Sequence, residues 1–161
     1  MKGFVVTLAA LACLAGPASA QPAQPAQQDP AQDVPQLRAC AVAAGLGDPE
    51  KLEACERPIL RSCNDDYALC YNRLFTAWDG LLNASFRELS RTGVLERRDA
   101  RNLQSAQRAW IKFRDEDCDF YAGVWPGSRP PGQLAACRHR ETRERAAVLT
   151  VRLEAAKKLR P

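Results

Sequence analysis

The chain has 161 residues, of which 46% are hydrophobic, and a formal net charge of +4. This length and composition predict one domain with a modest hydrophobic core. The positive excess is too small to indicate a nucleic-acid-binding protein.

Residues 1–20 have the pattern of a secretory signal peptide. Lys2 precedes an apolar run over residues 5–14, and Ala18, Ser19 and Ala20 form a small-residue cleavage site. The apolar run is shorter than the roughly 20 residues that a membrane-spanning helix needs. We therefore expect cleavage after Ala20 and a periplasmic or secreted protein that is not inserted in the membrane. Loss of Lys2 leaves 22 basic and 19 acidic residues, a net charge of +3.

Removal of this segment also takes away Cys13 and leaves an even number of cysteines. An even set in an oxidising compartment predicts three disulfides. No two cysteines have C-x2-C spacing and His139 is the only histidine, so we expect no metal site and no cofactor. The six cysteines are Cys40, Cys55, Cys63, Cys70, Cys118 and Cys137.

Residues 21–36 are rich in proline, alanine and glutamine, which predicts a disordered tether before a domain at 37–161. Asp48, Pro49 and Glu50 then start a short helix, which we expect to end near Glu56 because Pro58 interrupts it.

Three longer helices follow. The first begins at residues 64–66 and ends at Thr92 and Gly93, where glycine can take the left-handed cap. The second covers about residues 95–121, before a segment with three glycines and three prolines at 123–132, and the third covers about 133–159. The predicted fold is all-α, a small antiparallel bundle of three longer helices with a short N-terminal helical segment, stapled by disulfides.

The helix boundaries constrain the disulfides. Cys118 ends one helix and Cys137 begins the next, so an antiparallel hairpin brings them together and we expect them to pair. Seven residues of helix span about 10 Å, beyond the roughly 7 Å Cα limit for a disulfide. Cys63 and Cys70 are therefore not expected to pair if the helix starts at residue 64. In that case Cys70 needs Cys40 or Cys55 as its partner. The four N-terminal cysteines allow three connectivities, and the sequence does not decide among them.

Three spaced motifs carry a family resemblance. They are L-x2-A-Q-R-A-W-I-x-F-R-x3-C at residues 103–118, C-x8-D-x2-L-N from Cys70 with an aromatic at Phe86, and C…T-x2-R-x3-L from Cys137 to Leu149. Over about residues 63–153 the chain resembles the lysozyme-inhibitor LprI-like family of secreted bacterial proteins. The family's Gly-Gly-Ser loop reads Pro126, Gly127, Ser128 here, and residues 37–62 have no clear counterpart. The resemblance implies a protein that binds lysozyme and obstructs its cleft without catalysis.

The polar motif residues fall on one helix face. At 100° per residue, Leu103, Gln107, Trp110, Arg114, Cys118 and Tyr121 lie within about 80°, so they should face inward together. A buried Arg114 needs an anionic partner, for which Asp79 is the candidate, and we expect Asn83 and Gln107 to satisfy the remaining hydrogen-bond groups. We interpret seven polar or aromatic residues as parts of the scaffold: Asp79, Asn83, Gln107, Trp110, Arg114, Thr142 and Arg145.

The sequence offers poor material for catalysis. His139 lies between Arg138 and Arg140, where we expect an exposed or partly packed side chain, and no nucleophile with a base is evident. We therefore expect no enzyme.

Two surfaces are candidates for contact with lysozyme. The first is the loop clamped by the predicted disulfide, with Trp125, Gly127, Ser128 and Arg129, unless Trp125 packs back on the bundle. The second is the acidic set Asp115, Glu116 and Asp119. An alternative function is an envelope-stabilising or adaptor module that binds another periplasmic protein, or binds anionic surface polymers or lipid headgroups through its basic last helix. That helix carries Arg138, Arg140, Arg143, Arg152, Lys157, Lys158 and Arg160.

Overall fold

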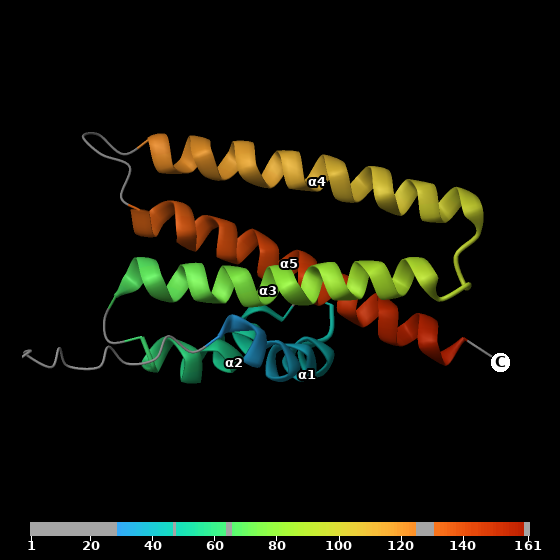
Figure 1. Cartoon of the computed structure of the whole chain (residues 1–161), viewed down its shortest axis with the longest axis horizontal. Coiled ribbons are helices and arrows are strands. Elements are labelled where there is room, and N and C mark those ends of the chain that lie inside the picture. The colour runs from blue at the N-terminus through green and yellow to red at the C-terminus, as the bar shows by residue number, and fades with distance from the viewer. Residues whose placement is uncertain (1–28, 47, 64–65, 125–130, 160–161) are drawn as a thin grey trace, which may run out of the picture.

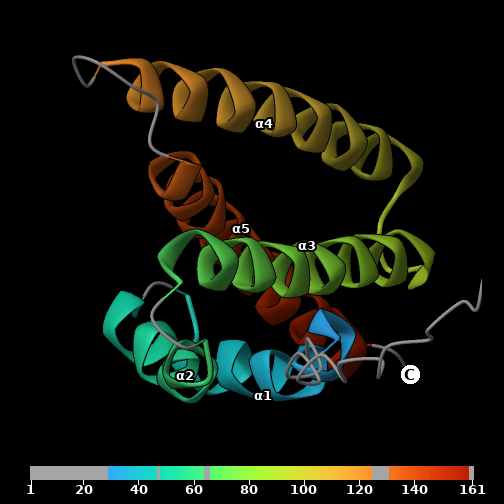
Figure 2. The same cartoon turned by 60° about the vertical axis from the view of Figure 1, so that its left-hand side comes forward.

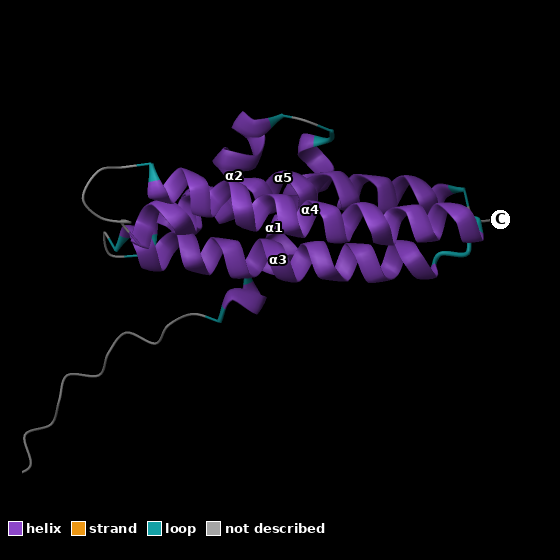
Figure 3. Ribbon diagram, turned by 90° about the horizontal axis from the view of Figure 1, so that it is seen from above, coloured by secondary structure: helices purple, strands orange, loops and turns teal. Residues whose placement is uncertain are grey.

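The computed structural model describes residues 29–46, 48–63, 66–124 and 131–159. These residues form a 3-10 helix, η1 (Pro30–Gln32), and the α-helices α1 (Val34–Ala44), α2 (Pro49–Arg61), α3 (Tyr67–Arg91), α4 (Arg97–Gly123) and α5 (Pro131–Lys158) (Figure 1). Figure 3 shows no strand in the described ranges, which confirms the all-α prediction. Within them, no helix has the length and apolar character needed to span a membrane.

The helices begin and end where local chemistry favours it. The Asp48 carboxylate accepts from the Lys51 amide at 3.1 Å, and the Asp66 carboxylate accepts from the Leu69 amide at 2.9 Å, so both act as N-caps. Gly93 has φ +74° after the end of α3, a backbone conformation that favours glycine. α3 starts at Tyr67, three residues after residue 64, where the argument about the disulfides placed its start.

α2 continues through Pro58 to Arg61, so the prediction that Pro58 interrupts this helix was wrong. A proline inside a helix removes one backbone hydrogen bond. Leu52 and Ile59, on either side of Pro58, are both buried against the rest of the molecule. This packing holds the helix through the proline, since tertiary contacts can override local propensity.

Residues 29–36 are helical and anchored, which differs from the predicted tether. η1 and the first turn of α1 occupy this segment, and Asp33 is buried. The Arg73 guanidinium on α3 donates to both Asp33 carboxylate oxygens at 2.9 Å. A bidentate pair of this kind orders a segment that has little apolar surface to bury. The remainder of the predicted tether, residues 21–28, lies outside the described residues.

The core lies between α3 and α5, with the α1–α2 pair covering one side. Its largest buried side chains include Trp78, Leu82, Leu149 and Leu153. α4 runs antiparallel to α3 and α5, and Figures 1 and 2 place it on the side of α3 opposite α1 and α2. The buried residues of α4 are Gln107, Arg114, Cys118 and Ala122. α4 is thus attached by buried polar side chains and a disulfide, together with Leu103 and Trp110, which are partly buried against the core.

Three disulfides are present. They join Cys40 to Cys55, Cys63 to Cys70 and Cys118 to Cys137, with Cα separations of 6.1, 5.5 and 5.5 Å. The structure thus contains the predicted pair across the α4–α5 hairpin. Cys63 and Cys70 do pair, because the helix start at residue 64, on which the argument against this pair depended, does not hold. Cys63 lies outside α3, which begins at Tyr67, and the Asp66 amide donates to the Cys63 carbonyl at 3.1 Å.

Replacing both Cys118 and Cys137 with serine is expected to lower the free energy of unfolding by about 3 kcal/mol, because the open loop gains conformational entropy in the unfolded chain. Urea denaturation monitored by circular dichroism measures the change. The reduced wild-type protein provides the control, since the difference between wild type and variant should shrink once all disulfides are reduced. An unchanged denaturation midpoint under oxidising conditions would contradict this expectation.

Candidate functional site

The inward face of α4 carries the residues of the sequence signature. Arg114 is 8% exposed, and its Nη2 lies 2.9 Å from Oδ1 of Asp115, the next residue on α4. Its Nη1 lies 3.6 Å from Asp79 Oδ1 on α3 and donates to Thr142 Oγ1 on α5 at 3.3 Å. One guanidinium therefore ties together three helices.

Aromatic rings complete this junction. The Arg114 guanidinium carbon lies 5.1 Å from the Trp110 ring centre and 5.4 Å from that of Phe75. Arg145 approaches the same Trp110 ring at 5.9 Å, and its Nε donates to Gln107 Oε1 at 3.0 Å. Contacts of this type attach α4 by cation–π and hydrogen-bonding interactions.

The structure places these residues close to the predicted arrangement, with two differences. Asp79 contacts Arg114 and accepts from Asn83 Nδ2 at 2.8 Å. However, the closest carboxylate to Arg114 is Asp115, and Gln107 contacts Arg145 instead of Arg114. In the ranges that the structure describes, no group of three or more histidine, cysteine or acidic residues could hold a metal ion.

A second polar cluster, which the sequence did not predict, is buried between α2, α3 and α5. The Glu56 carboxylate of α2 accepts from Trp78 Nε1 at 2.5 Å and from Arg143 Nη1 at 3.3 Å, and its Oε1 lies 2.7 Å from His139 Nε2. Glu56 is 2% exposed and His139 is 3% exposed. We call these four residues the Glu56 cluster.

The Glu56 cluster corrects two sequence expectations. His139 is neither exposed nor partly packed, and Arg143 does not belong to a solvent-facing basic surface. His139 and Arg143 are four residues apart on α5 and so share the face that meets α2. One signal was present in the sequence: Glu56 has helical spacing with the apolar residues Leu52 and Ile59, which predicts an inward position.

An open pocket of about 450 Å³ lies over the Glu56 cluster. Tyr67 and Tyr71 line it with ring centres 4.4 Å apart, and the Tyr71 ring lies 5.3 Å from that of His139. Burial, with a side-chain hydrogen bond to Tyr67, raises the pKa of Tyr71 to about 12. The Tyr71 phenol therefore stays protonated at neutral pH and is a poor candidate for a general base.

Several basic residues of α5, though not Arg145 or Arg152, are paired with carboxylates within the part of the molecule that the structure describes. Arg138 lies 3.7 Å from Asp119, and Arg140 lies 3.0 Å from Glu141. These pairs, with the buried Arg143, break up the basic surface on which the polymer-binding alternative depends. Arg160 lies outside the described residues.

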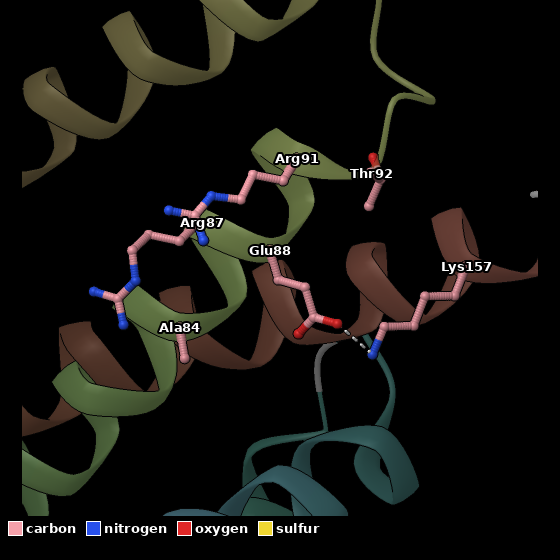
Figure 4. Close-up of a pocket in the computed structure, with 6 residues that line it drawn as sticks. All are labelled: Ala84, Arg87, Glu88, Arg91, Thr92 and Lys157. Atoms are coloured by element: carbon pink, nitrogen blue, oxygen red, sulfur yellow. Dashed lines mark ion pairs between the residues drawn. The ribbon is translucent and has the colours of Figure 1, made fainter.

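Lys157 takes part in a network that joins α5 to α3 and α1. Its Nζ lies 2.9 Å from Glu88 and 3.0 Å from Glu154, and these hydrogen bonds raise the pKa of Lys157. Figure 4 shows the Glu88–Lys157 pair beside a pocket of about 250 Å³. Arg38 of α1 approaches the same two carboxylates at 3.8 and 3.7 Å. The Lys157 ammonium group therefore connects helices and is already paired with carboxylates, so it is not free to bind a polymer.

The outer face of α4 carries large apolar side chains in solvent. Phe113 is 55% exposed, Phe120 is 72% exposed and Val124 is 59% exposed. Together with the exposed Glu116 they have helical spacing, so they project from one side of α4. We call these four residues the outward stripe. It covers the last three turns of α4 and the C-cap residue Val124, at the same level along the helix as Cys118 but on the opposite face.

The predicted contact residues divide between described and undescribed parts of the chain. Asp115, Glu116 and Asp119 are paired with Arg114, Lys112 and Arg138, and the Glu116 and Asp119 side chains remain at least half exposed. Tyr121, expected to face inward, is exposed at the edge of α4 beneath the Arg140 guanidinium. The loop residues Trp125, Gly127, Ser128 and Arg129 lie outside the described residues.

Comparison with known families identifies the group to which the chain belongs. The sequence model of the lysozyme inhibitor LprI family matches residues 63–149, more than half of the chain. The chain belongs to the LprI lysozyme inhibitor family. No curated protein and no solved structure gave a significant match. The predicted membership is thus confirmed, and three disulfides are typical of a protein outside the cytoplasm.

The family match covers only part of this LprI family member, from residue 63 to residue 149. The matched residues include the outward stripe and the whole Arg114 junction, by which we mean Arg114 and its contacts on α3, α4 and α5. These contacts are Phe75, Asp79, Trp110, Asp115 and Thr142. α1 and α2 precede residue 63, so Glu56 lies outside the match, whereas Trp78, His139 and Arg143 lie inside it. The Glu56 cluster therefore links α2, which precedes the matched residues, to α3 and α5 within the match.

Proposed function

We propose that this LprI family member binds lysozyme through the disulfide-clamped end of the α4–α5 hairpin and obstructs the lysozyme cleft without catalysis. Family membership supports the identity of the partner. The outward stripe supports the location, and its 72% exposed Phe120 is the observation that carries the proposal. Phe120 is grouped with the exposed Phe113 and Val124, and exposed apolar patches of this kind are typical of protein-binding surfaces.

The chemistry around Phe120 suits a basic partner surface. Glu116 lies one turn before it within the stripe, and Asp119 is its exposed neighbour. The chain has a net positive charge, so long-range attraction to a basic lysozyme is not expected and local complementarity must provide specificity. The loop residues Trp125, Gly127, Ser128 and Arg129 follow α4 directly in the sequence and belong to the proposed contact region.

The mode of inhibition is steric. Lysozyme cleaves its glycan with two carboxylates in a cleft that must accept a sugar chain. A hairpin end whose two helices are joined at Cys118 and Cys137 loses little conformational freedom on binding, which favours affinity. We further propose that the protein acts outside the cytoplasm, after cleavage of residues 1–20.

Replacing Phe120 with alanine is expected to weaken inhibition by about thirtyfold, because anchor residues contribute at least about 2 kcal/mol to binding. The assay is the lysis of bacterial cell walls by c-, g- and i-type lysozymes in the presence of the oxidised mature protein. Ile111→Ala is the matched control: Ile111 is 40% exposed on α4 but lies away from the outward stripe, so this variant should inhibit normally.

Each result has a defined meaning. If a stoichiometric excess of wild-type protein slows none of the three lysozyme classes, inhibition of those classes is excluded. If the wild type inhibits and Phe120→Ala inhibits equally well, the contact lies elsewhere on the hairpin.

A further inference from the structure

A groove lies at the end of the molecule opposite the outward stripe. It is bounded by the end of α3, the first turns of α4 and the last turns of α5, and has a volume of about 530 Å³. Its walls are mainly apolar and include Leu89, Leu95, Leu103, Ala106, Ala155 and Leu159. Alanine side chains end at Cβ, so Ala106 of α4 and Ala155 of α5 leave space that larger residues would fill.

Two guanidinium groups line this apolar groove. Arg145 and Arg152 are seven residues apart on α5, on the same side of the helix. Burial, together with the charge of Arg152, lowers the pKa of Arg145. The positive charges of Arg145 and Arg152 therefore repel each other, and both side chains line the same groove.

Neither cation has a carboxylate partner in the described ranges. The hydrogen bond of Arg145 goes to the neutral amide oxygen of Gln107, at 3.0 Å. Asp99, an acidic residue at the groove, lies 3.6 Å from the Arg98 guanidinium. The groove thus combines apolar walls with positive charge that the molecule does not itself neutralise.

We propose that this groove binds a single-chain fatty acid, with the alkyl chain against the leucine and alanine walls and the carboxylate between Arg145 and Arg152. A carboxylate would relieve the repulsion between the two cations and accept charge-assisted hydrogen bonds from both. The volume lies within the range of small-molecule sites. The groove involves the first half of α4, whereas the outward stripe occupies the second half, so this inference does not depend on lysozyme binding.

Calorimetric titration with decanoate, below its micelle-forming concentration, tests the proposal without lysozyme. Decanoate is expected to bind with one-to-one stoichiometry, and decyltrimethylammonium, which has the same alkyl chain and the opposite charge, is not. Adding two methylenes to the acid should tighten binding by about tenfold, because each buried methylene contributes to the transfer free energy.

Two variants locate the site. Arg152→Gln is expected to weaken decanoate binding by about tenfold through loss of one charge-assisted contact. Arg108→Gln is the matched control, since Arg108 is an exposed residue of α4 that does not line the groove, and it should bind as the wild type does. Ala155→Trp should block binding by filling the groove, with circular dichroism used to verify that the helices are retained.

Three results would overturn the proposal. Equal affinity for decanoate and decyltrimethylammonium would mean nonspecific adsorption to apolar surface. Unchanged decanoate binding by both Arg152→Gln and Ala155→Trp would place the ligand elsewhere. Absence of decanoate binding, together with dimerisation that Ala155→Trp abolishes, would make the groove a contact between two copies of the chain.

Discussion

Replacement of Glu56 with alanine is expected to lower the free energy of unfolding by about 3–5 kcal/mol, the cost of removing one partner from a buried charged cluster. The carboxylate is the common hydrogen-bond partner of Trp78, His139 and Arg143. Without it these buried groups lose that partner, and the space of the missing side chain adds a cavity. Urea denaturation measures the effect, and the melting temperature should fall by roughly 10 °C or more.

Two further variants make this prediction specific. Glu56→Gln keeps an acceptor oxygen but removes the charge opposite Arg143, so its loss of stability should lie between those of the wild type and Glu56→Ala. Glu53→Gln is the matched control, because Glu53 is on the same helix and lies 3.7 Å from Arg143 but is 61% exposed. An exposed ion pair contributes about 0–1 kcal/mol. Equal effects at positions 53 and 56 would contradict the importance of burial.

Arg114→Ala is expected to cost about 2–3 kcal/mol of folding stability, near the low end for a broken buried pair. The guanidinium is buried between Trp110 and Phe75, so its loss leaves a cavity and removes two cation–π contacts. Its partners Asp79 and Asp115 are 38% and 43% exposed, so water can solvate them after the substitution and limits the cost. Thermal and urea denaturation both measure this change.

The Arg114 series also separates a scaffold role from a contact role. Arg114→Lys should have an intermediate effect, since lysine keeps the charge but lacks the planar fork that stacks on Trp110. Lys112→Ala, at an exposed position two residues away, should change stability by less than about 0.5 kcal/mol. Below its melting temperature, Arg114→Ala should inhibit lysozyme as the wild type does. Loss of inhibition at unchanged stability would instead make the signature part of the binding surface.

The sequence predicted those parts of the fold that depend on local chemistry. Asp48 and Gly93 marked a helix start and a helix end because capping involves only neighbouring residues. The contact of Arg114 with Asp79 was predictable because helical periodicity placed Arg114 on an inward face, where it needs an anionic partner, and Asp79 is an acidic residue of the preceding helix. Pairing of Cys63 with Cys70 was missed through an error of three residues in the start of α3. An error of that size decides whether a turn or a helix separates two cysteines.

The Glu56 cluster could not have been predicted in the same way. Glu56 and His139 are 83 residues apart, and their contact depends on how α2 docks against α5. Helical periodicity shows that Glu56 faces inward but does not say which helix it meets. The exposure of Tyr121 was missed for a related reason. Near the C-terminal end of α4, fewer side chains face the bundle than periodicity predicts. Cys118 and Ala122 make the contact there.

The order of the disulfides bears on how the chain acquires them. The cysteines of the described structure are bonded in sequential order, the first to the second, the third to the fourth and the fifth to the sixth, with separations of 15, 7 and 19 residues. A chain that enters an oxidising compartment N-terminus first would expose these pairs one after another. An oxidase that joins successive thiols as they emerge would then produce the native connectivity directly. Maturation would need a thiol oxidant but little correction of mispaired cysteines by an isomerase.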